Sequence, residues 1–447
     1  MQRTNNLNGL LLFLIGLFTS TEVRIVGAVG ISELVLLLVA PFVFFSTIGT
    51  LRKDGFMPYL YMTFIVMAGC LISAYANKTP TTSLMKGFAE VYSLFAVVVC
   101  LHRLLREDFL AIRWLVLGGA LSSILCIFIF QKGSLRQFGD DALISADAMA
   151  ATIGYAVFWA NITRSCLYVP IEGWYLRIRK WYFLVASIVV ICSAMFLSGA
   201  SGRSSTLCAG ITTILLMVGS PERKRLDFMR RHLIILGAVL LAFGIGYKAI
   251  YREMATSGML GEEAQNKYMR QTKRGSGIIS LLMGGRAEFF AGGYACLQKP
   301  LLGYGSWAVD TDGVYGEFLR QYGVEGEYEN YILESYRQYS NGGMAHLIPG
   351  HSCIIQFWLW FGIVGLIFWI YILWLLKNVL FKWLAIYPPW YGYLACVVPI
   401  FLWKVFFSPF GGRIGIATLI TVCLFIRAVA CRGFPAGGVL GRFERYE

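Results

Sequence analysis

Residues 351–374 read HSCIIQFWLWFGIVGLIFWIYILW, and after its first few residues this stretch is continuously apolar and aromatic. An apolar run of about 20 residues is long enough to cross a bilayer as a helix, so the stretch predicts a membrane-spanning segment. The run begins with His351, one of only four histidines in the chain. A histidine at the mouth of a membrane helix is either an ordinary interfacial residue or a reactive group, and the rest of the chain decides between the two.

The composition excludes a water-soluble globule. Of the 447 residues, 57% are hydrophobic and 14% are charged, and the mean hydropathy is +0.64. Such a chain has too little polar surface to cover itself in water. We therefore expect an all-α polytopic membrane protein, with about twelve helices of membrane-spanning length. The apolar windows lie near residues 8–22, 30–46, 57–75, 83–101, 108–130, 146–163, 181–199, 204–219, 232–250, 352–376, 390–408 and 414–430.

The basic residues predict the orientation. Cytoplasmic loops of membrane proteins carry an excess of Lys and Arg. If the N-terminus is cytoplasmic, the loops on that side hold roughly three times as many Lys and Arg residues as the opposite short loops. Both termini are therefore expected in the cytoplasm. The formal charge of +14 is then mostly a topology signal, and nucleic acid is not expected as a partner.

One non-membrane segment is large, and it divides the chain into three parts. We expect helices one to nine in residues 1–250, a large periplasmic loop with short helices in residues 251–350, and the last three helices with a cytoplasmic tail in residues 351–447. Long loops in compact proteins are usually functional. The short cytoplasmic loops leave no room for a nucleotide-binding domain.

Four polar residues are predicted on the non-cytoplasmic side at the depth of the lipid headgroups. Arg203 lies in the tight turn SGASGRSST, Arg286 follows Gly284 and Gly285, Arg413 follows two glycines, and His351 opens the tenth helix. Guanidinium groups bind phosphate oxygens by paired, charge-assisted hydrogen bonds, so these arginines favour a lipid diphosphate as ligand. An imidazole group near neutral pH can accept a proton from an attacking hydroxyl.

Three motifs resemble those of the bacterial O-antigen ligase and O-antigen polymerase superfamily. His351, Ser352, nine further residues and the glycines Gly362 and Gly365 match its histidine signature. The stretch GGRAEFFAGGYACLQKPLLGYGSW, residues 284–307, is similar to its Gly-Arg, helix, Pro-Leu and G-x-G pattern. The SGASGRSST turn is similar to its small-residue and arginine turn. The predicted order of helices and loop fits the same family, so the resemblance covers most of the chain.

The resemblance implies a GT-C-like membrane glycosyltransferase that uses sugars carried on undecaprenyl diphosphate and needs no cofactor or metal. In that family scheme Arg203 and Arg286 bind the donor diphosphate, and His351 positions or deprotonates the acceptor hydroxyl. Arg413 and Ser352 are possible supporting residues. The implied partners are a carrier-linked glycan donor, a lipid A-core or carrier-linked acceptor, and membrane lipid. The implied location is the bacterial inner membrane, with the site on the periplasmic side.

The last part of the large loop departs from the family pattern, because it is acidic and rich in tyrosine. Its acids are either a solvated helix face or part of a groove for sugar. The tyrosines that we expect in such a groove are Tyr315, Tyr322, Tyr328 and Tyr331. The D-T-D triplet at residues 310–312 is too weak a pattern to predict a metal site, and His346 with His351 lacks an obvious third ligand.

Two alternatives stay open. A ligase transfers a finished chain to lipid A-core, whereas a polymerase transfers it to another carrier-linked repeat unit, and the histidine signature favours the ligase modestly. A polysaccharide or lipid transporter is the alternative of another class, because ionisable residues fall inside predicted helices, where charge usually faces a cavity or a partner. These residues are Glu33, Glu90, Arg113, Asp147 and Lys404. Against a transporter, the chain has no paired, broken helices in equivalent halves.

Overall fold

The computed structural model describes about half of the chain. The described residues are 2–19, 21–24, 28–107, 111–128, 287–322, 328–333, 346–386, 391–408, 410 and 413–431, with single residues or short pieces at 211, 252–254, 256–259, 265 and 269. Of the residues described, 80% are helical. The predicted windows at 146–163, 181–199, 204–219 and 232–250 lie outside this part, apart from residue 211.

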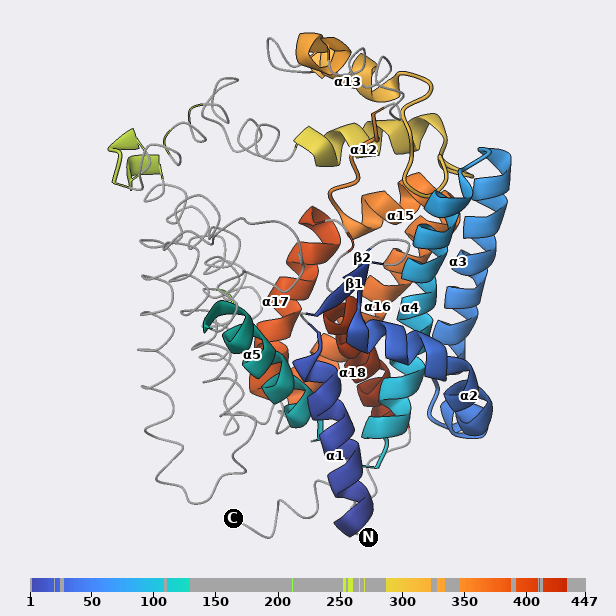
Figure 1. The fold of residues 1–447 in the computed structure, drawn as a ribbon, viewed down its shortest axis with the longest axis vertical. Helices are drawn as coiled ribbons and strands as arrows, with labels where there is room; N and C mark the ends of the chain where they lie inside the picture. The colour runs from blue at the N-terminus through green and yellow to red at the C-terminus, as the bar shows by residue number, and fades with distance from the viewer. Residues whose placement is uncertain are drawn as a thin grey trace.

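The other eight predicted windows each contain helix (Figure 1). The N-terminal helices are α1 (Gln2–Leu17), α2 (Ile31–Lys53), α3 (Met57–Ala76), α4 (Thr81–Leu105) and α5 (Ile112–Phe128). Two short helices follow later in the chain, α12 (Ala287–Gln298) and α13 (Val314–Tyr322). The C-terminal helices are α15 (Cys353–Phe361), α16 (Ile363–Ile386), α17 (Tyr391–Phe407) and α18 (Arg413–Cys431).

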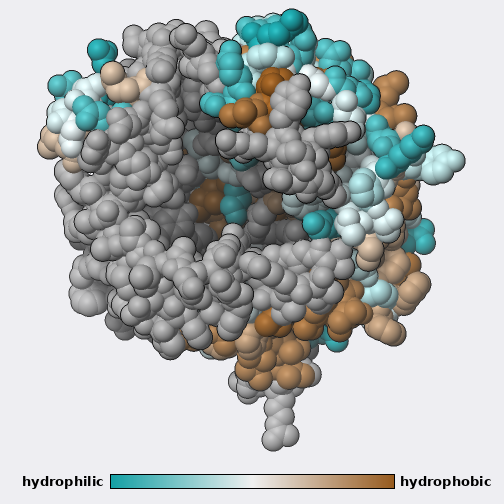
Figure 2. Space-filling view, turned by 45° about the horizontal axis from the view of Figure 1, so that its top comes forward, coloured by the Kyte–Doolittle hydropathy of each residue, from teal (hydrophilic) through white to brown (hydrophobic). Residues whose placement is uncertain are grey.

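Three of the described helices are long and apolar enough to cross a membrane: Ile31–Lys53, Met57–Ala76 and Thr81–Leu105. Large apolar side chains on the first two face outward, including Phe42, which is 79% exposed, and Tyr75, which is 91% exposed. Figure 2 shows hydrophobic residues along the flank of the molecule and hydrophilic residues gathered at the end that holds α12 and α13. The prediction of a helical protein with membrane-spanning segments is confirmed at this level.

Helix α4 forms the centre of the described bundle. It contacts α2, α3 and α18, and its residues from Ser93 to His102 are all buried. A helix that is buried on every side needs small and apolar residues all round rather than on one stripe. The run VVVC at residues 97–100 supplies them. This central helix links the end of the molecule near α12 and α15 to the opposite end, near the turn after α2.

Two features differ from the sequence predictions. The protein is not purely helical, because β1 (Glu22–Arg24) and β2 (Ala28–Gly30) form a short antiparallel hairpin with Val23 opposite Val29. The expected continuous helix over residues 352–376 is also wrong, since Gly362 separates α15 from α16. Gly362 has φ +66°, a left-handed conformation that breaks the helix and that glycine adopts without strain.

Candidate functional site

His351 lies just before α15 and contacts a carboxylate from α12. Its Nδ1 atom is 2.8 Å from Glu288 Oε2, and the two side chains are 45% and 50% exposed. Nδ1 itself is buried, and the contact lies off the line of a hydrogen bond. The exposed area therefore belongs to the rest of the imidazole ring. His351 is thus a half-exposed histidine whose buried Nδ1 atom lies next to the Glu288 carboxylate.

Ser352 fixes the position of His351. It is the N-cap of α15, where its Oγ accepts a hydrogen bond from Ile355 N at 3.3 Å and donates one to Val405 O on α17 at 2.9 Å. The serine is fully buried. The side chain thus anchors the start of α15 to a second helix, and its hydroxyl faces the protein interior rather than the exposed side of His351.

Gly292 brings α12 close enough for Glu288 to reach the histidine. Residues four apart lie on one face of a helix, so Glu288 and Gly292 both face the chain that leads into α15. A Cβ atom on Gly292 would lie 2.5 Å from Pro349 O and 2.6 Å from Ile355 Cγ2. The same atom on Gly293 would meet only Ile355 Cδ1, at 3.9 Å. Of these two glycines, only Gly292 lies so close to the neighbouring chain that a side chain has no space.

The glycine motifs pack against each other through the backbone. A Cβ on Gly362 would collide with Leu301 O, and Gly303, also left-handed with φ +68°, packs on Leu359 O and Gly362 N. Tyr304 N donates to Leu359 O at 2.7 Å, and Ile363 N donates to Leu301 O at 3.2 Å. The turn at residues 301–305 is therefore fitted into the break between α15 and α16.

The same turn is tied to the N-terminal helices. Ser73 on α3 lies with its hydroxyl 2.5 Å from Leu302 O and 2.7 Å from Trp360 O, and Asn77 Nδ2 donates to Gly303 O at 3.1 Å. These hydrogen bonds join α3, the turn and α15 into one packed unit. The unit carries His351 at its edge, so the histidine is held by structure from three distant parts of the chain.

An aromatic hollow of about 420 Å³ lies on α12, and its lining begins at Phe289, the residue after Glu288 in the sequence. It is lined almost entirely by apolar atoms from α12, α13 and α15. Trp358 donates its ring N–H to Pro300 O at 3.0 Å, so this ring presents no unpaired polar group to an apolar ligand. The lining residues are Phe289, Phe290, Gly293, Tyr294, Leu297, Phe318, Tyr322 and Trp358.

Of the four predicted sugar-binding tyrosines, one lines the aromatic hollow and the other three pack against neighbouring side chains. Tyr322 lines the aromatic hollow. Tyr315 and Tyr331 pack edge to face, with ring centroids 5.5 Å apart, and Tyr331 donates its hydroxyl to Asp310 at 2.8 Å. Tyr328 packs on a small core formed by α12 and α13. Three of the four tyrosines thus hold α13 over α12.

The acids of the D-T-D triplet have separate structural partners. Asp310 is buried and caps α13 by accepting from Tyr315 N at 3.0 Å and Gly316 N at 3.3 Å. Asp312 pairs with Lys299 at 2.7 Å, and this hydrogen bond lowers the pKa of the Asp312 carboxyl. The interpretation of these acids as sugar ligands gains no support from this arrangement.

The predicted arginines lie largely beyond what the structure describes. Arg203 and Arg286 are outside the described residues, although Arg286 directly precedes α12 in the sequence. Arg413 is the first residue of α18, and its side chain is outside the described part. The diphosphate-binding role of Arg203 and Arg286 beside His351 stays a prediction, as does the supporting role of Arg413.

Two predicted intramembrane acids are buried. Glu33 is 6% exposed and Glu90 is 4% exposed. Gln356 on α15 places its Nε2 3.5 Å from Glu90 Oε2 and accepts from Phe410 N at 2.7 Å. Glu90 thus belongs to a polar contact between α4 and α15, one turn beyond Ser352.

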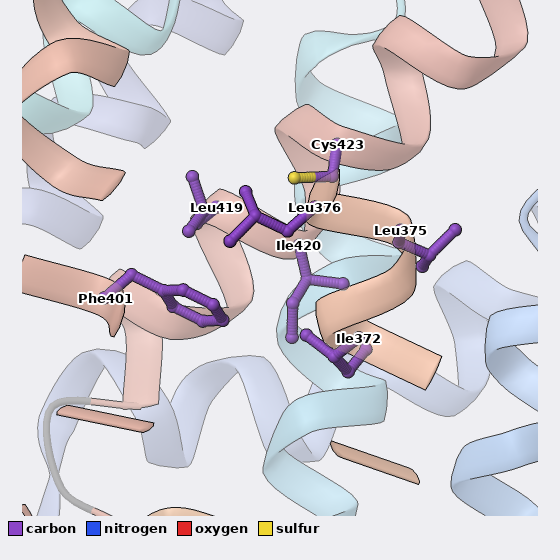
Figure 3. A pocket seen from close by; sticks show the side chains of 7 residues that line it. All are labelled: Ile372, Leu375, Leu376, Phe401, Leu419, Ile420 and Cys423. Carbon is purple, nitrogen blue, oxygen red and sulfur yellow. The ribbon is translucent and has the colours of Figure 1, made fainter. Parts of the chain in front are cut away.

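A second apolar gap lies between α16, α17 and α18 (Figure 3). Its side chains leave no room even for a water molecule, so this gap is packing and not a binding site. The lining residues are Ile372, Leu375, Leu376, Phe401, Leu419, Ile420 and Cys423.

The residue that the sequence interpretation missed is Glu288. The only signal was an acid in the first turn of a short amphipathic helix, two residues after Arg286. Among the residues described, no group of three or more His, Cys, Asp and Glu side chains is arranged to hold a metal ion. In comparison with known proteins, no family model, no curated protein and no solved structure matches this chain.

Proposed function

We propose that this chain is a bacterial inner-membrane glycosyltransferase of the O-antigen ligase type. It transfers a glycan from undecaprenyl diphosphate to a saccharide acceptor, lipid A-core, on the periplasmic side. The observation that carries the proposal is the half-exposed His351, backed by Glu288 and held at the edge of the membrane-spanning bundle. Such a group can accept the proton of an acceptor hydroxyl.

The aromatic hollow supports a lipid-linked donor. Its lining residues come from α12, the helix that carries Glu288, and from α13 and α15. An apolar, aromatic surface at the end of membrane helices suits an isoprenoid chain better than a free sugar, because buried sugar hydroxyls need hydrogen-bond partners. The carrier would thereby present its diphosphate near the first turn of α12, next to Arg286 in the sequence.

The reaction assigned to this site is a displacement at the anomeric carbon. The acceptor oxygen forms the new glycosidic bond as its proton passes to His351, and the bond to the diphosphate oxygen breaks with its electron pair. Attack from the face opposite the leaving group inverts the configuration. Arg203 and Arg286 neutralise the charge that develops on the diphosphate, a contribution of about 3 kcal/mol for a well-placed donor.

Deletion of the gene with separation of the cell's polysaccharides tests the proposal. Loss of polymer from lipid A-core, with polymer persisting on the carrier, is the result expected for a ligase. Accumulation of single carrier-linked repeats would instead assign the chain to the polymerases. Loss of linked polymer with the precursor trapped in the cytoplasm would indicate a transporter and overturn the proposal.

The arginine roles have a matched test in the purified protein. Arg286→Ala is expected to reduce transfer from a carrier-linked glycan by at least about 100-fold and to leave the thermal unfolding midpoint unchanged. Arg320→Ala is the control, because Arg320 is exposed and paired with Glu317 on α13. Equal activity of the two variants would refute the diphosphate-binding role.

A further inference from the structure

We propose that Glu288 is a positioning residue for His351, an inference that rests on the proposed function. Glu288 accepts the Nδ1 hydrogen of the imidazole and thereby leaves Nε2 unprotonated and directed at the acceptor hydroxyl. In a neutral histidine, the hydrogen bond made by one ring nitrogen sets which nitrogen carries the proton. The 2.8 Å contact between Nδ1 and Oε2 is the observation behind the assignment.

The pattern of burial supports this orientation. Nδ1 is buried although 45% of the His351 side chain is exposed, so the ring turns its Nδ1 edge toward α12 and its remaining surface outward. The Glu288 carboxylate is half-exposed on a flexible stem. A rotation of this carboxylate aligns it with the Nδ1 hydrogen, and catalytic hydrogen bonds commonly tighten in this way when substrate binds.

The backbone holds the two side chains in register. The buried Gly292 seats α12 on Pro349 and Ile355, and Ser352 fixes the first turn of α15 to α17. Cys296 adds a contact between its sulfur and Ile355 O at 3.7 Å. The approach of α12 to His351 is therefore built into the packing of both helices.

The carboxylate also has a role during proton transfer. When the acceptor hydroxyl gives its proton to Nε2, His351 becomes an imidazolium cation. The negative charge of Glu288 stabilises this cation, and the proton later passes to solvent. An acid in the first turn of a helix is also favoured by the helix dipole, so a purely structural role for Glu288 is the competing explanation.

Nitrogen-15 NMR of histidine-labelled protein separates the two explanations without an activity assay. The chain has four histidines, and loss of one signal in His351→Ala assigns the ring. In the neutral ring we expect the hydrogen on Nδ1 in the wild type and a shift toward the Nε2-protonated form in Glu288→Gln. The control is Glu317→Gln, an exposed acid that bonds Arg320 on α13. An unchanged His351 tautomer in Glu288→Gln would overturn the proposal.

Steady-state kinetics supply the second measurement. We expect Glu288→Gln to lower kcat by about 10- to 100-fold with little change in KM for the carrier-linked donor, and Glu288→Asp to recover part of the loss. Wild-type kcat in Glu288→Gln would refute the role of Glu288. Absence of transfer by the wild-type protein would instead refute the proposed function, and the tautomer measurement would still decide whether Glu288 orients His351.

Discussion

The protein pairs a histidine with a carboxylate at both ends of the central helix α4, and the two pairs differ in burial. At the end near α12, His351 and Glu288 lie 2.8 Å apart and are about half-exposed. At the opposite end His102 Nε2 lies 3.0 Å from Asp54 Oδ2, and His102 is fully buried. Helix α4 has 25 residues, which corresponds to about 37 Å between these ends.

The contacts of the buried pair His102 and Asp54 indicate a structural role, in which the pair stabilises the packing of the helices. Arg106 Nε donates to the same Asp54 oxygen at 3.0 Å, and the His102 ring packs against both Phe56 and Phe425, with centroid distances of 4.6 Å and 5.7 Å. Its polar contacts join the turn after α2 to α4. A histidine and a carboxylate thus join helices where water is excluded, whereas at the α12 end the same two kinds of side chain leave half of the imidazole accessible to water.

The largest expected effect is loss of transfer in His351→Ala. Removal of the proton acceptor should reduce transfer by about 100-fold or more, while the thermal unfolding midpoint stays within the error of the wild type because the ring is 45% exposed. The rate of transfer from a carrier-linked glycan and the unfolding curve in detergent are the two measurements. Full activity in this variant would show that His351 is needed for transfer no more than the buried His102.

The reverse pattern is expected for His102→Ala. The free energy of unfolding should fall by about 3 kcal/mol, because the change leaves a cavity beside two aromatic rings and takes a hydrogen-bond partner from a largely buried carboxylate. Activity per folded molecule should stay at the wild-type level at low temperature. A variant with unchanged stability would show that the contacts of Asp54 with His102 and Arg106 do not stabilise the bundle.

Gly292→Ala sharpens the comparison at the site end. The added methyl group must displace Pro349 or Ile355, so we expect a loss of about 1–3 kcal/mol and a fall in transfer of about tenfold, since a shift of α12 separates Glu288 from His351. Gly293→Ala is the matched control for stability, because its methyl group would lie 3.9 Å from the nearest neighbour. Equal unfolding midpoints of the two alanine variants would contradict the close-approach argument.

The smallest effect concerns the exposed pair Lys299 and Asp312. The pKa of folded Asp312 is lowered by its hydrogen bond to Lys299, so the unfolded state binds more protons near pH 4. The pair therefore contributes stability above the ordinary aspartate pKa, and this contribution is lost as the pH falls through the folded pKa. It should stay below about 1 kcal/mol, since both side chains are more than one-third exposed.

Unfolding curves of Asp312→Asn and wild type at several pH values check this prediction. The difference between the two proteins should be present at neutral pH, shrink at acid pH and shrink also in high salt. A difference that grows as the pH falls would have the wrong sign for a stabilised carboxylate.

Hydropathy predicted where the described long helices lie, because each of them contains an apolar run long enough to be found from composition alone. It missed the break at Gly362, since glycine is common inside membrane helices and the surrounding letters stay apolar. The reason for the break is Leu301, whose carbonyl occupies the space of a Cβ on Gly362. A contact between residues so distant in sequence leaves no local pattern.

The candidate site was predictable only in part. The position of His351 at a helix mouth followed from the sequence, but its partner Glu288 did not, because an acid in the first turn of a helix already has an ordinary explanation. The four tyrosines were predicted to act together because the loop is rich in tyrosine. Their spacing could not reveal that Tyr331 donates a hydrogen bond to Asp310 while Tyr322 lines the hollow.

The fit between the turn at residues 301–305 and the α15–α16 break separates what can vary in this protein from what cannot. The fit is made by main-chain atoms and by glycines, so a side chain added at Gly303 or Gly362 would collide with the opposite backbone. The aromatic hollow is lined by side chains from three helices. Substitutions can therefore reshape the hollow, while the backbone joint next to α15 has no space for a side chain at either glycine.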